Sequence, residues 1–269
     1  MLTAEMKERL LAFVADDVGK GDITGELVPL RETKARIVAN EDCVLAGIEE
    51  AAFIFEKRGL FVRMMKRDGE RVKKGGTVMR VSGLNRALYE TERVALNVLS
   101  RMSGVATECA KAAGVATPVR VAVTRKTTPG FGVFEKKAAV IGGVLPHRAD
   151  LSEMVLLKKQ HTEAMGGITK AIMAAKSKHG VFEVEVNTVG EAVKAAEAGA
   201  PIIMLDNIGV GGTKKAVAEI RRRGKAAIEL SGGITLANLR RYAALRPDFV
   251  SMGSLTRDCR GIDFSMVTE

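Results

Sequence analysis

From residue 119 onward, short apolar runs of strand character alternate with segments of helical character. From the fourth run onward the repeat is about two dozen residues, the length of one strand-plus-helix unit. The runs are Val119–Val123, Met154–Leu157, Phe182–Val186, Ile202–Leu205, Ala226–Leu230 and Phe249–Met252, and the helices between them include Glu163–Lys178, Val189–Ala198, Gly212–Arg223 and Leu236–Ala244. Because this alternation lacks a glycine-rich dinucleotide fingerprint, it favours a parallel α/β barrel over a doubly wound sheet.

The first part of the chain has a different pattern, in which apolar and polar residues alternate over short runs. The four runs that indicate strands are Lys34–Ala39, Cys43–Ala46, Leu60–Met64 and Thr77–Val81. Helices are expected at Ala4–Asp16 and Glu49–Lys57. This part therefore predicts a small domain of helices and an antiparallel sheet.

A long helical stretch, Ala87–Ala113, follows these strands and carries an apolar stripe of helical period. We expect it to bridge the two parts of the chain and to be interrupted at Gly104. The predicted domains are residues 1–106, with the bridging helix, and residues 107–269, with the barrel. The prediction leaves open whether the last residues return to the first domain.

The composition excludes several classes of protein. The formal net charge is +10, but aromatic residues make up only 4%, Trp is absent and the basic residues are scattered. Stacking surfaces for bases are therefore scarce, and we expect no nucleic-acid partner; anionic small-molecule substrates explain part of the charge. No apolar run reaches the length of a membrane span, and the three cysteines fit no metal or disulfide pattern. We predict a cytoplasmic protein without a membrane partner.

Nearly every apolar run of the second half finishes with polar or ionisable residues or a glycine. This strand-end set comprises Arg125, Lys126, Lys158, Glu183, Glu185, Asp206, Glu229, Ser231, Gly253 and Ser254. In a parallel barrel the carboxyl ends of all strands open onto one face, where active sites lie. The set therefore predicts an active site on that face.

Five cations stand out around this predicted site, namely Arg125, Lys126, His147, Arg148 and Lys158. They outnumber the acids close to them in the sequence, so they predict a small, multiply charged anionic ligand. Arg offers paired hydrogen bonds to a carboxylate or phosphate, while Lys acts as a point charge. The alternative is that each cation pairs with a nearby carboxylate of the protein.

Acidic residues and glycine-rich turns complete the pattern. Glu185 and Asp206 end neighbouring strands, and their oxygens suit Mg²⁺ held mainly through a substrate's phosphates, with a buried structural network as the alternative. Glu183 points to the same face of its strand as Glu185. Ser231–Thr235 and Met252–Thr256 each follow a strand and open a helix, so their backbone N–H groups are candidates for binding phosphate.

The chain resembles the quinolinate phosphoribosyltransferase family of NAD synthesis over nearly its whole length. The motifs that carry the resemblance are Gly21–Thr24, Glu41–Gly47, Glu92–Asn97, Ser103–Thr107, Thr124–Gly130, His147-Arg148, Glu183–Val186, Met204–Asn207 and Ser231–Ile234. The resemblance implies an α/β fold, with an N-terminal α/β sandwich domain and an incomplete, seven-stranded TIM-like barrel. It also implies a homodimer or a hexamer built as a trimer of dimers, in which Arg93 reaches into the neighbour's site.

The resemblance implies a reaction and a role for each site residue. Phosphoribosyl pyrophosphate and quinolinate would give nicotinate mononucleotide, pyrophosphate and CO₂, with Mg²⁺ as the cofactor. Lys126, Glu185 and Asp206 would act in catalysis, and the two acids would also hold the metal. Substrate binding would fall to Arg93, Arg125, Lys126, His147, Arg148, Lys158, Ser231, Gly232, Gly233, Gly253 and Ser254.

The chain departs from the family pattern at several positions. Val123 replaces an Asp, Lys159-Gln160 replaces Asp-Asn, and Pro146 and Arg257 are also unusual. The sequence from Pro146 to Glu153 is similar to that of the ModD proteins, relatives encoded with molybdenum transport genes. The alternatives are a ModD-like phosphoribosyltransferase for a different aromatic acid, or a non-catalytic binder of phosphoribosylated ligands.

Overall fold

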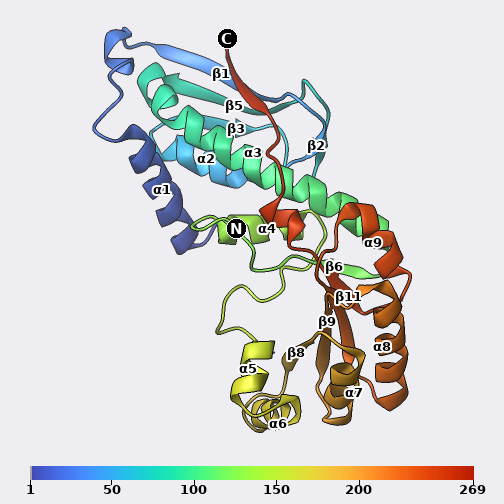
Figure 1. Cartoon of the computed structure of the whole chain (residues 1–269). Helices are drawn as coiled ribbons and strands as arrows, with labels where there is room; N and C mark the ends of the chain where they lie inside the picture. The colour runs from blue at the N-terminus through green and yellow to red at the C-terminus, as the bar shows by residue number, and fades with distance from the viewer. Residues whose placement is uncertain (1) are drawn as a thin grey trace. The chain divides into compact units, whose positions relative to one another are not determined.

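The computed structural model describes residues 2–269 and divides them into two compact units (Figure 1). Of the described residues, the first unit holds 2–110, Thr127–Gly143 and Asp258–Glu269, and the second holds Lys111–Lys126 and Val144–Arg257. The first contains an antiparallel sheet and the second a parallel sheet, so the predicted mixed α/β fold is confirmed. The predicted division between residues 106 and 107 stays a prediction.

The sheet of the first unit has the strand order β12-β1-β5-β3, and all its pairs are antiparallel. Its strands are β1 (Glu32–Ala39), β3 (Phe61–Met64), β5 (Thr77–Leu84) and β12 (Phe264–Thr268), and a separate pair joins β2 (Cys43–Val44) to β4 (Arg71–Val72). Side chains alternate across the sheet, so Ile37 and Val81 are buried while Arg80 is exposed. The C-terminal strand β12 lies beside β1 in Figure 1.

The helices of this part of the chain are α1 (Ala4–Val18), α2 (Ile48–Lys57), α3 (Asn85–Ala116) and α4 (Gly132–Ile141), with a short 3-10 turn, η1, at Gly25–Leu27. Helix α2 contacts β3 and β5 of the sheet, and α1 contacts α2. The predicted interruption of α3 at Gly104 is wrong, because the helix runs through this residue. A Cβ at Gly104 would lie 2.2 Å from the carbonyl oxygen of Arg260. Glycine here admits a close backbone neighbour and does not end the helix.

The second unit is built on a parallel sheet with the strand order β6-β11-β10-β9-β8-β7. The strands are β6 (Arg120–Ala122), β7 (Val155–Leu157), β8 (Phe182–Val186), β9 (Ile202–Asp206), β10 (Ala227–Ser231) and β11 (Phe249–Ser251). A seventh segment joins only through one parallel bridge, from Leu145 to Ala122 of β6. The expected seventh strand is thus reduced to a single residue at the sheet edge.

Helices follow the strands of this sheet as a βα repeat requires. They are α5 (Lys159–Ala164), α6 (Ile168–Lys178), α7 (Val189–Glu197), α8 (Gly209–Arg223), α9 (Leu236–Ala243) and α10 (Ser254–Arg257). The prediction of one helix over Glu163–Lys178 is wrong. Gly166 and Gly167 adopt φ angles of 76° and 119°, which a continuing helix does not allow, so α5 ends and α6 begins around them.

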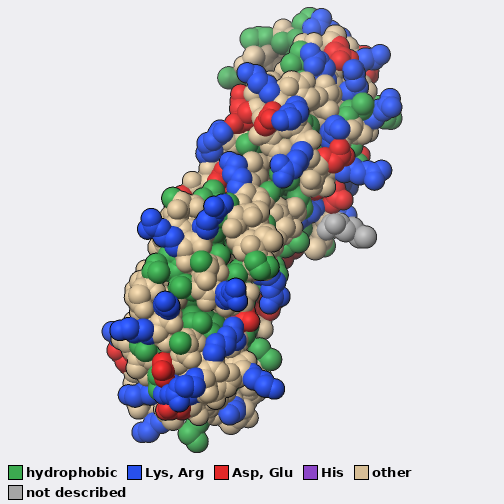
Figure 2. Space-filling view, turned by 90° about the vertical axis from the view of Figure 1, so that its right-hand side faces the viewer, with side chains coloured by type: hydrophobic (Ala, Val, Ile, Leu, Met, Phe, Trp, Pro, Cys, Tyr) green, Lys and Arg blue, Asp and Glu red, His purple; other side chains and the backbone are tan. Residues whose placement is uncertain are grey.

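No helix in the described part of the chain is both long and apolar enough to cross a membrane. Lys and Arg side chains are spread over the visible face in Figure 2 and are interspersed with acidic ones. The positive net charge therefore does not gather into one patch on this face.

Candidate active site

The polar strand ends of the second unit line one cavity of about 370 Å³, which we call the strand-end pocket. It is lined by Thr124, Arg125, Lys126, His147, Arg148, Leu156, Lys158, Glu185, Met204, Asp206, Asn207, Glu229, Ser231 and Ser251. The parallel register places Glu185 opposite Met204, and Asp206 opposite Ser231. Residues at these positions share the inner face of the sheet, whereas Val184 and Leu205 between them are buried on the opposite face.

Three cations of the pocket, Arg125, Lys126 and Arg148, lie on loops. Arg125 and Lys126 belong to the loop that follows β6. In this loop the Lys126 amide donates to Thr124 Oγ1, and Thr256 Oγ1 donates to the Lys126 carbonyl. Arg148 is only 8% exposed and donates through Nη1 to the Met154 carbonyl at 3.0 Å. Burial, followed by the like charge of Arg125, lowers the pKa of Arg148. An anionic ligand would relieve this repulsion.

The acids predicted to bind metal lie in the same pocket but make different contacts. Glu185 Oε2 accepts a hydrogen bond from Lys158 Nζ at 2.9 Å. Asp206 Oδ2 accepts one from Asn207 Nδ2 at 2.9 Å. For Lys158, therefore, the alternative of pairing with a carboxylate of the protein holds in this structure. Two carboxylates on adjacent strands remain a suitable donor set for a Mg²⁺ that keeps waters and phosphate oxygens as its other ligands.

His147 stands between two buried glutamates. Its Nε2 lies 3.3 Å from Glu183 Oε2 and 3.3 Å from Glu229 Oε2, and both glutamates are 0% exposed. Burial disfavours a charge on the imidazole, whereas the two carboxylates favour a proton on Nε2 and act to raise the pKa of His147. Burial, opposed by His147 and reinforced by Glu229, raises the pKa of Glu183.

The two glycine turns adjoin the pocket, and the first leaves no room for a side chain at Gly232. Gly232 has φ of 86°, and a Cβ there would lie 2.6 Å from the Asn207 amide nitrogen. At Gly253 a Cβ would lie 2.8 Å from Lys126 Cδ. Ser254 begins α10 and donates to the Ile234 carbonyl. Both turns thus bring bare backbone close to pocket residues, as a phosphate site requires.

The structure brings together most of the predicted residues, with one exception. Arg93 belongs to the first unit, where it lies on the exposed side of α3 with Nη2 3.6 Å from Glu92 Oε1. The sequence predicted no catalytic, substrate-binding or metal-binding role for Asn207 or Glu229, although both line the pocket. The signal for Glu229 was present, because it belongs to the strand-end set. Asn207 has a left-handed φ of 54°, which sequence alone does not reveal.

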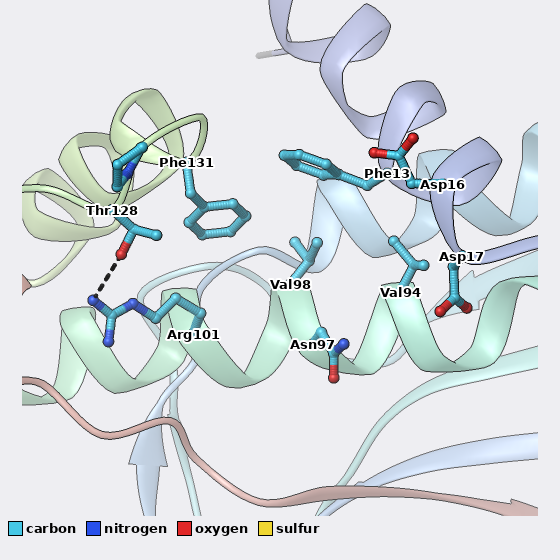
Figure 3. Close-up of a pocket in the computed structure, with 10 residues that line it drawn as sticks. Phe13, Asp16, Asp17, Val94, Asn97, Val98, Arg101, Thr128 and Phe131 are labelled. Carbon is cyan, nitrogen blue, oxygen red and sulfur yellow. Dashed lines mark hydrogen bonds between the residues drawn. The ribbon is translucent and has the colours of Figure 1, made fainter.

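A larger cavity, of about 690 Å³, lies in the first unit (Figure 3). Phe13 of α1 and Phe131 lie over Val94 and Val98 of α3, and the two ring centroids are 6.0 Å apart. Its cation, Arg101, is tied to protein groups including the buried carboxylate of Glu135. Asp16 and Asp17 also line this cavity, but among the described residues no second cation joins Arg101 there to bind an anion. We therefore place the candidate active site in the second unit.

Comparison with known proteins matches both parts of the chain to one family. The model of the quinolinate phosphoribosyl transferase C-terminal domain matches residues 103–267, and that of the N-terminal domain matches residues 22–103. The chain belongs to the quinolinate phosphoribosyltransferase family. A protein of Archaeoglobus fulgidus named probable nicotinate-nucleotide pyrophosphorylase [carboxylating] is 43% identical over 253 residues, which cover 91% of this chain and 97% of that one. The human nicotinate-nucleotide pyrophosphorylase [carboxylating] is 37% identical, with 87% of this chain and 82% of the human one covered.

Solved structures of family members have the same fold. The nicotinate-nucleotide pyrophosphorylase of Francisella tularensis aligns with a TM-score of 0.94 at 30% identity, over 100% of this chain and 98% of that one. The NadC structure from Streptococcus pyogenes aligns with a TM-score of 0.92 at 34% identity, over 99% and 97% of the two chains. The expectation of membership in the quinolinate phosphoribosyltransferase family is thereby confirmed.

The departures from the family pattern lie away from the pocket lining. Val123 is fully buried and donates its amide to the Leu145 carbonyl. Lys159 begins α5 and lies 3.8 Å from Glu163, with both side chains exposed. Neither residue is among those that line the strand-end pocket, and the same holds for Pro146, Gln160 and Arg257. These departures therefore change residues outside the lining of the strand-end pocket.

Proposed function

We propose that this chain transfers the phosphoribosyl group of phosphoribosyl pyrophosphate to quinolinate and releases pyrophosphate and CO₂ to form nicotinate mononucleotide. The name of its relatives, nicotinate-nucleotide pyrophosphorylase [carboxylating], describes this reaction in the opposite direction. Both substrates are anions, and both are the substrates of the family to which the chain belongs.

The observation that carries the proposal is the convergence of cations at the carboxyl ends of parallel strands. Arg125, Lys126 and Arg148 line one pocket with the carboxylates of Glu185, Asp206 and Glu229, and glycine turns lie beside it. The two carboxylates of quinolinate would satisfy the cations, and the glycine turns would receive phosphate groups. No observation on this pocket favours a different acid, because the unusual residues lie outside its lining.

Mg²⁺ is part of the proposal. Glu185 and Asp206 would hold it, together with oxygens of the pyrophosphate and water. The ion would supply positive charge to the departing pyrophosphate. Because Lys158 lies 2.9 Å from Glu185, its ammonium must share that carboxylate with the metal or move toward the acid substrate.

The chemistry needs positioning and charge more than a nucleophile from the protein. The pyridine nitrogen attacks C1 of the ribose, the bond from C1 to pyrophosphate breaks, and the sugar passes through oxocarbenium character. The ring nitrogen is then positively charged, so it stabilises the electron pair that stays on the neighbouring ring carbon when the carboxylate departs as CO₂. The ring carbon finally takes a proton. Lys126 would stabilise the developing negative charge on the leaving group, and Arg125 and Arg148 would hold the diacid.

Assembly is also proposed and not observed. A homodimer, or a hexamer built from three dimers, would allow Arg93 of one chain to reach the neighbour's pocket. The exposed position of Arg93 on α3 supports this role, because its side chain is 60% exposed. The cytoplasmic location stays a prediction from the sequence.

One experiment tests the proposed reaction directly. Purified protein is incubated with Mg²⁺, phosphoribosyl pyrophosphate and quinolinate that carries a label in the carboxyl group next to the ring nitrogen. We expect equal amounts of pyrophosphate and labelled CO₂, with nicotinate mononucleotide identified by its mass. Pyrophosphate release only with another aromatic acid would contradict quinolinate as the acceptor. Tight ligand binding without pyrophosphate release would contradict the enzyme assignment.

A further inference from the structure

His147 adopts an uncommon backbone conformation at the edge of the pocket. Its φ is 54°, in the left-handed region that residues other than glycine seldom occupy. Such a conformation persists where surrounding contacts hold it in place. The next residue is Arg148, one of the cations assigned to the diacid. The backbone conformation of His147 therefore sets the position and direction of the Arg148 backbone, from which its side chain extends.

The imidazole of His147 contacts side chains of two strands of the parallel sheet. Glu183 on β8 and Glu229 on β10 approach the same nitrogen, Nε2, each at 3.3 Å. None of the four carboxylate oxygens has a hydrogen-bond partner in residues 2–269, so the two 3.3 Å contacts with Nε2 are the polar contacts that hold them. A buried carboxylate without a partner is costly, so both depend on the imidazole.

The other ring nitrogen of His147, Nδ1, contacts the backbone of Arg148. Nδ1 accepts a hydrogen bond from the Arg148 amide at 2.8 Å, so it needs a lone pair there. Because a protonated Nδ1 could not accept this hydrogen bond, the contact favours the neutral imidazole, whereas the two carboxylates favour the charged one. The single proton of the neutral ring then lies on Nε2. The three ligand atoms lie within 4.8 Å of one another, as a metal site would require. A metal on Nε2, however, would leave the imidazole with no N–H at all. The group is therefore suited to a proton and not to a metal ion.

Packing alone does not hold this turn. A second cavity, of about 400 Å³, is lined by Glu183, His147, Arg148 and apolar residues such as Ile202 and Phe249. His147 and Arg148 thus line cavities on two sides, the strand-end pocket and this one. Side chains next to open space are oriented by polar contacts, because close packing is absent there.

We propose that Glu183 and Glu229 are positioning residues for the diacid side of the pocket. They hold the Nε2 proton of His147, His147 Nδ1 holds the Arg148 amide, and this arrangement keeps the Arg148 guanidinium directed toward the substrate carboxylates. The inference rests on the proposed function, because it assigns Arg148 to quinolinate.

The test compares two substitutions of Glu229. Glu229→Gln keeps an oxygen that accepts the Nε2 proton, whereas Glu229→Met keeps the length of the side chain and removes the acceptor. We expect Glu229→Met to raise KM for quinolinate about tenfold or more, with kcat and KM for phosphoribosyl pyrophosphate within about twofold. Glu229→Gln should stay within about threefold of the unaltered protein. Thr213→Val, which removes a buried hydrogen bond within α8 at a residue that lines neither of the two cavities, serves as the control for lost stability.

A second readout does not depend on activity. The chain has only three histidines, so the ¹⁵N resonances of the His147 ring can be assigned. We expect a protonated Nε2 and an unprotonated Nδ1 in the unaltered protein, and loss of this pattern in Glu229→Met. An unchanged KM for quinolinate in Glu229→Met, parallel losses in all constants as in Thr213→Val, or a stoichiometric metal ion that Glu229→Met loses would each overturn the proposal. If the unaltered protein does not react with quinolinate, the proposed function fails, while the ¹⁵N pattern still decides how His147 is held.

Discussion

Replacement of Arg148 by alanine is the sharpest test of the pocket. The guanidinium is buried, one of its five N–H groups donates to the Met154 carbonyl, and its pKa is already lowered by burial and by Arg125. Removing one partner of a buried, hydrogen-bonded charge pair costs about 2–5 kcal/mol. This corresponds to a loss of about 30-fold to 5,000-fold in affinity for quinolinate.

Isothermal titration calorimetry would measure the affinity of the variant for quinolinate and, separately, for phosphoribosyl pyrophosphate. The loss should be confined largely to the diacid. Arg148→Lys should show an intermediate loss, because lysine keeps the charge without the paired hydrogen bonds. Arg221→Ala is a matched control, since Arg221 also donates to a backbone carbonyl of the second unit but contacts Asp248 and not the pocket. A folded Arg148→Ala protein that binds quinolinate as well as the unaltered one would refute the reasoning.

Three further outcomes follow from the same structure. Glu185→Gln should raise the Mg²⁺ concentration for half-maximal activity about tenfold, and a chelator should abolish activity in both proteins; equal Mg²⁺ dependence would exclude Glu185 as a ligand. Gly232→Ala should raise KM for phosphoribosyl pyrophosphate about tenfold or more, because the site has positive φ and no room for a Cβ, whereas Gly180→Ala, in open space, should leave it unchanged. Lys137→Met should lower the free energy of unfolding by about 3–5 kcal/mol, because it removes the ammonium 2.9 Å from the fully buried Glu50. Burial raises the pKa of Glu50 and Lys137 opposes this, so loss of the lysine should make urea stability fall further as pH rises from about 5 to 8; a pH-independent loss would contradict the ion-pair explanation.

Much of the fold follows from local patterns. The apolar run Phe182–Val186 is a strand with the bounds expected from its sequence, and the polar residues that end the parallel strands do share one pocket. Local patterns gave a wrong prediction where a residue is required by a tertiary contact. Glycine often ends a helix, but Gly104 lies inside α3. It is needed there because the tertiary structure places the Arg260 carbonyl against it.

The sequence by itself determined the alternation of strands and helices, the side of each strand that carries the polar residues, and the cationic character of the site. These properties are local, since side-chain direction along a strand has a period of two residues and the carboxyl ends of parallel strands share one edge. Only the tertiary structure decided which of these residues meet. Lys158 contacts Glu185, and His147 contacts Glu183 and Glu229, because strand order and register bring distant segments together. The buried His147 contacts, which no spacing in the chain records, follow from the need of two carboxylates away from water to share one proton donor.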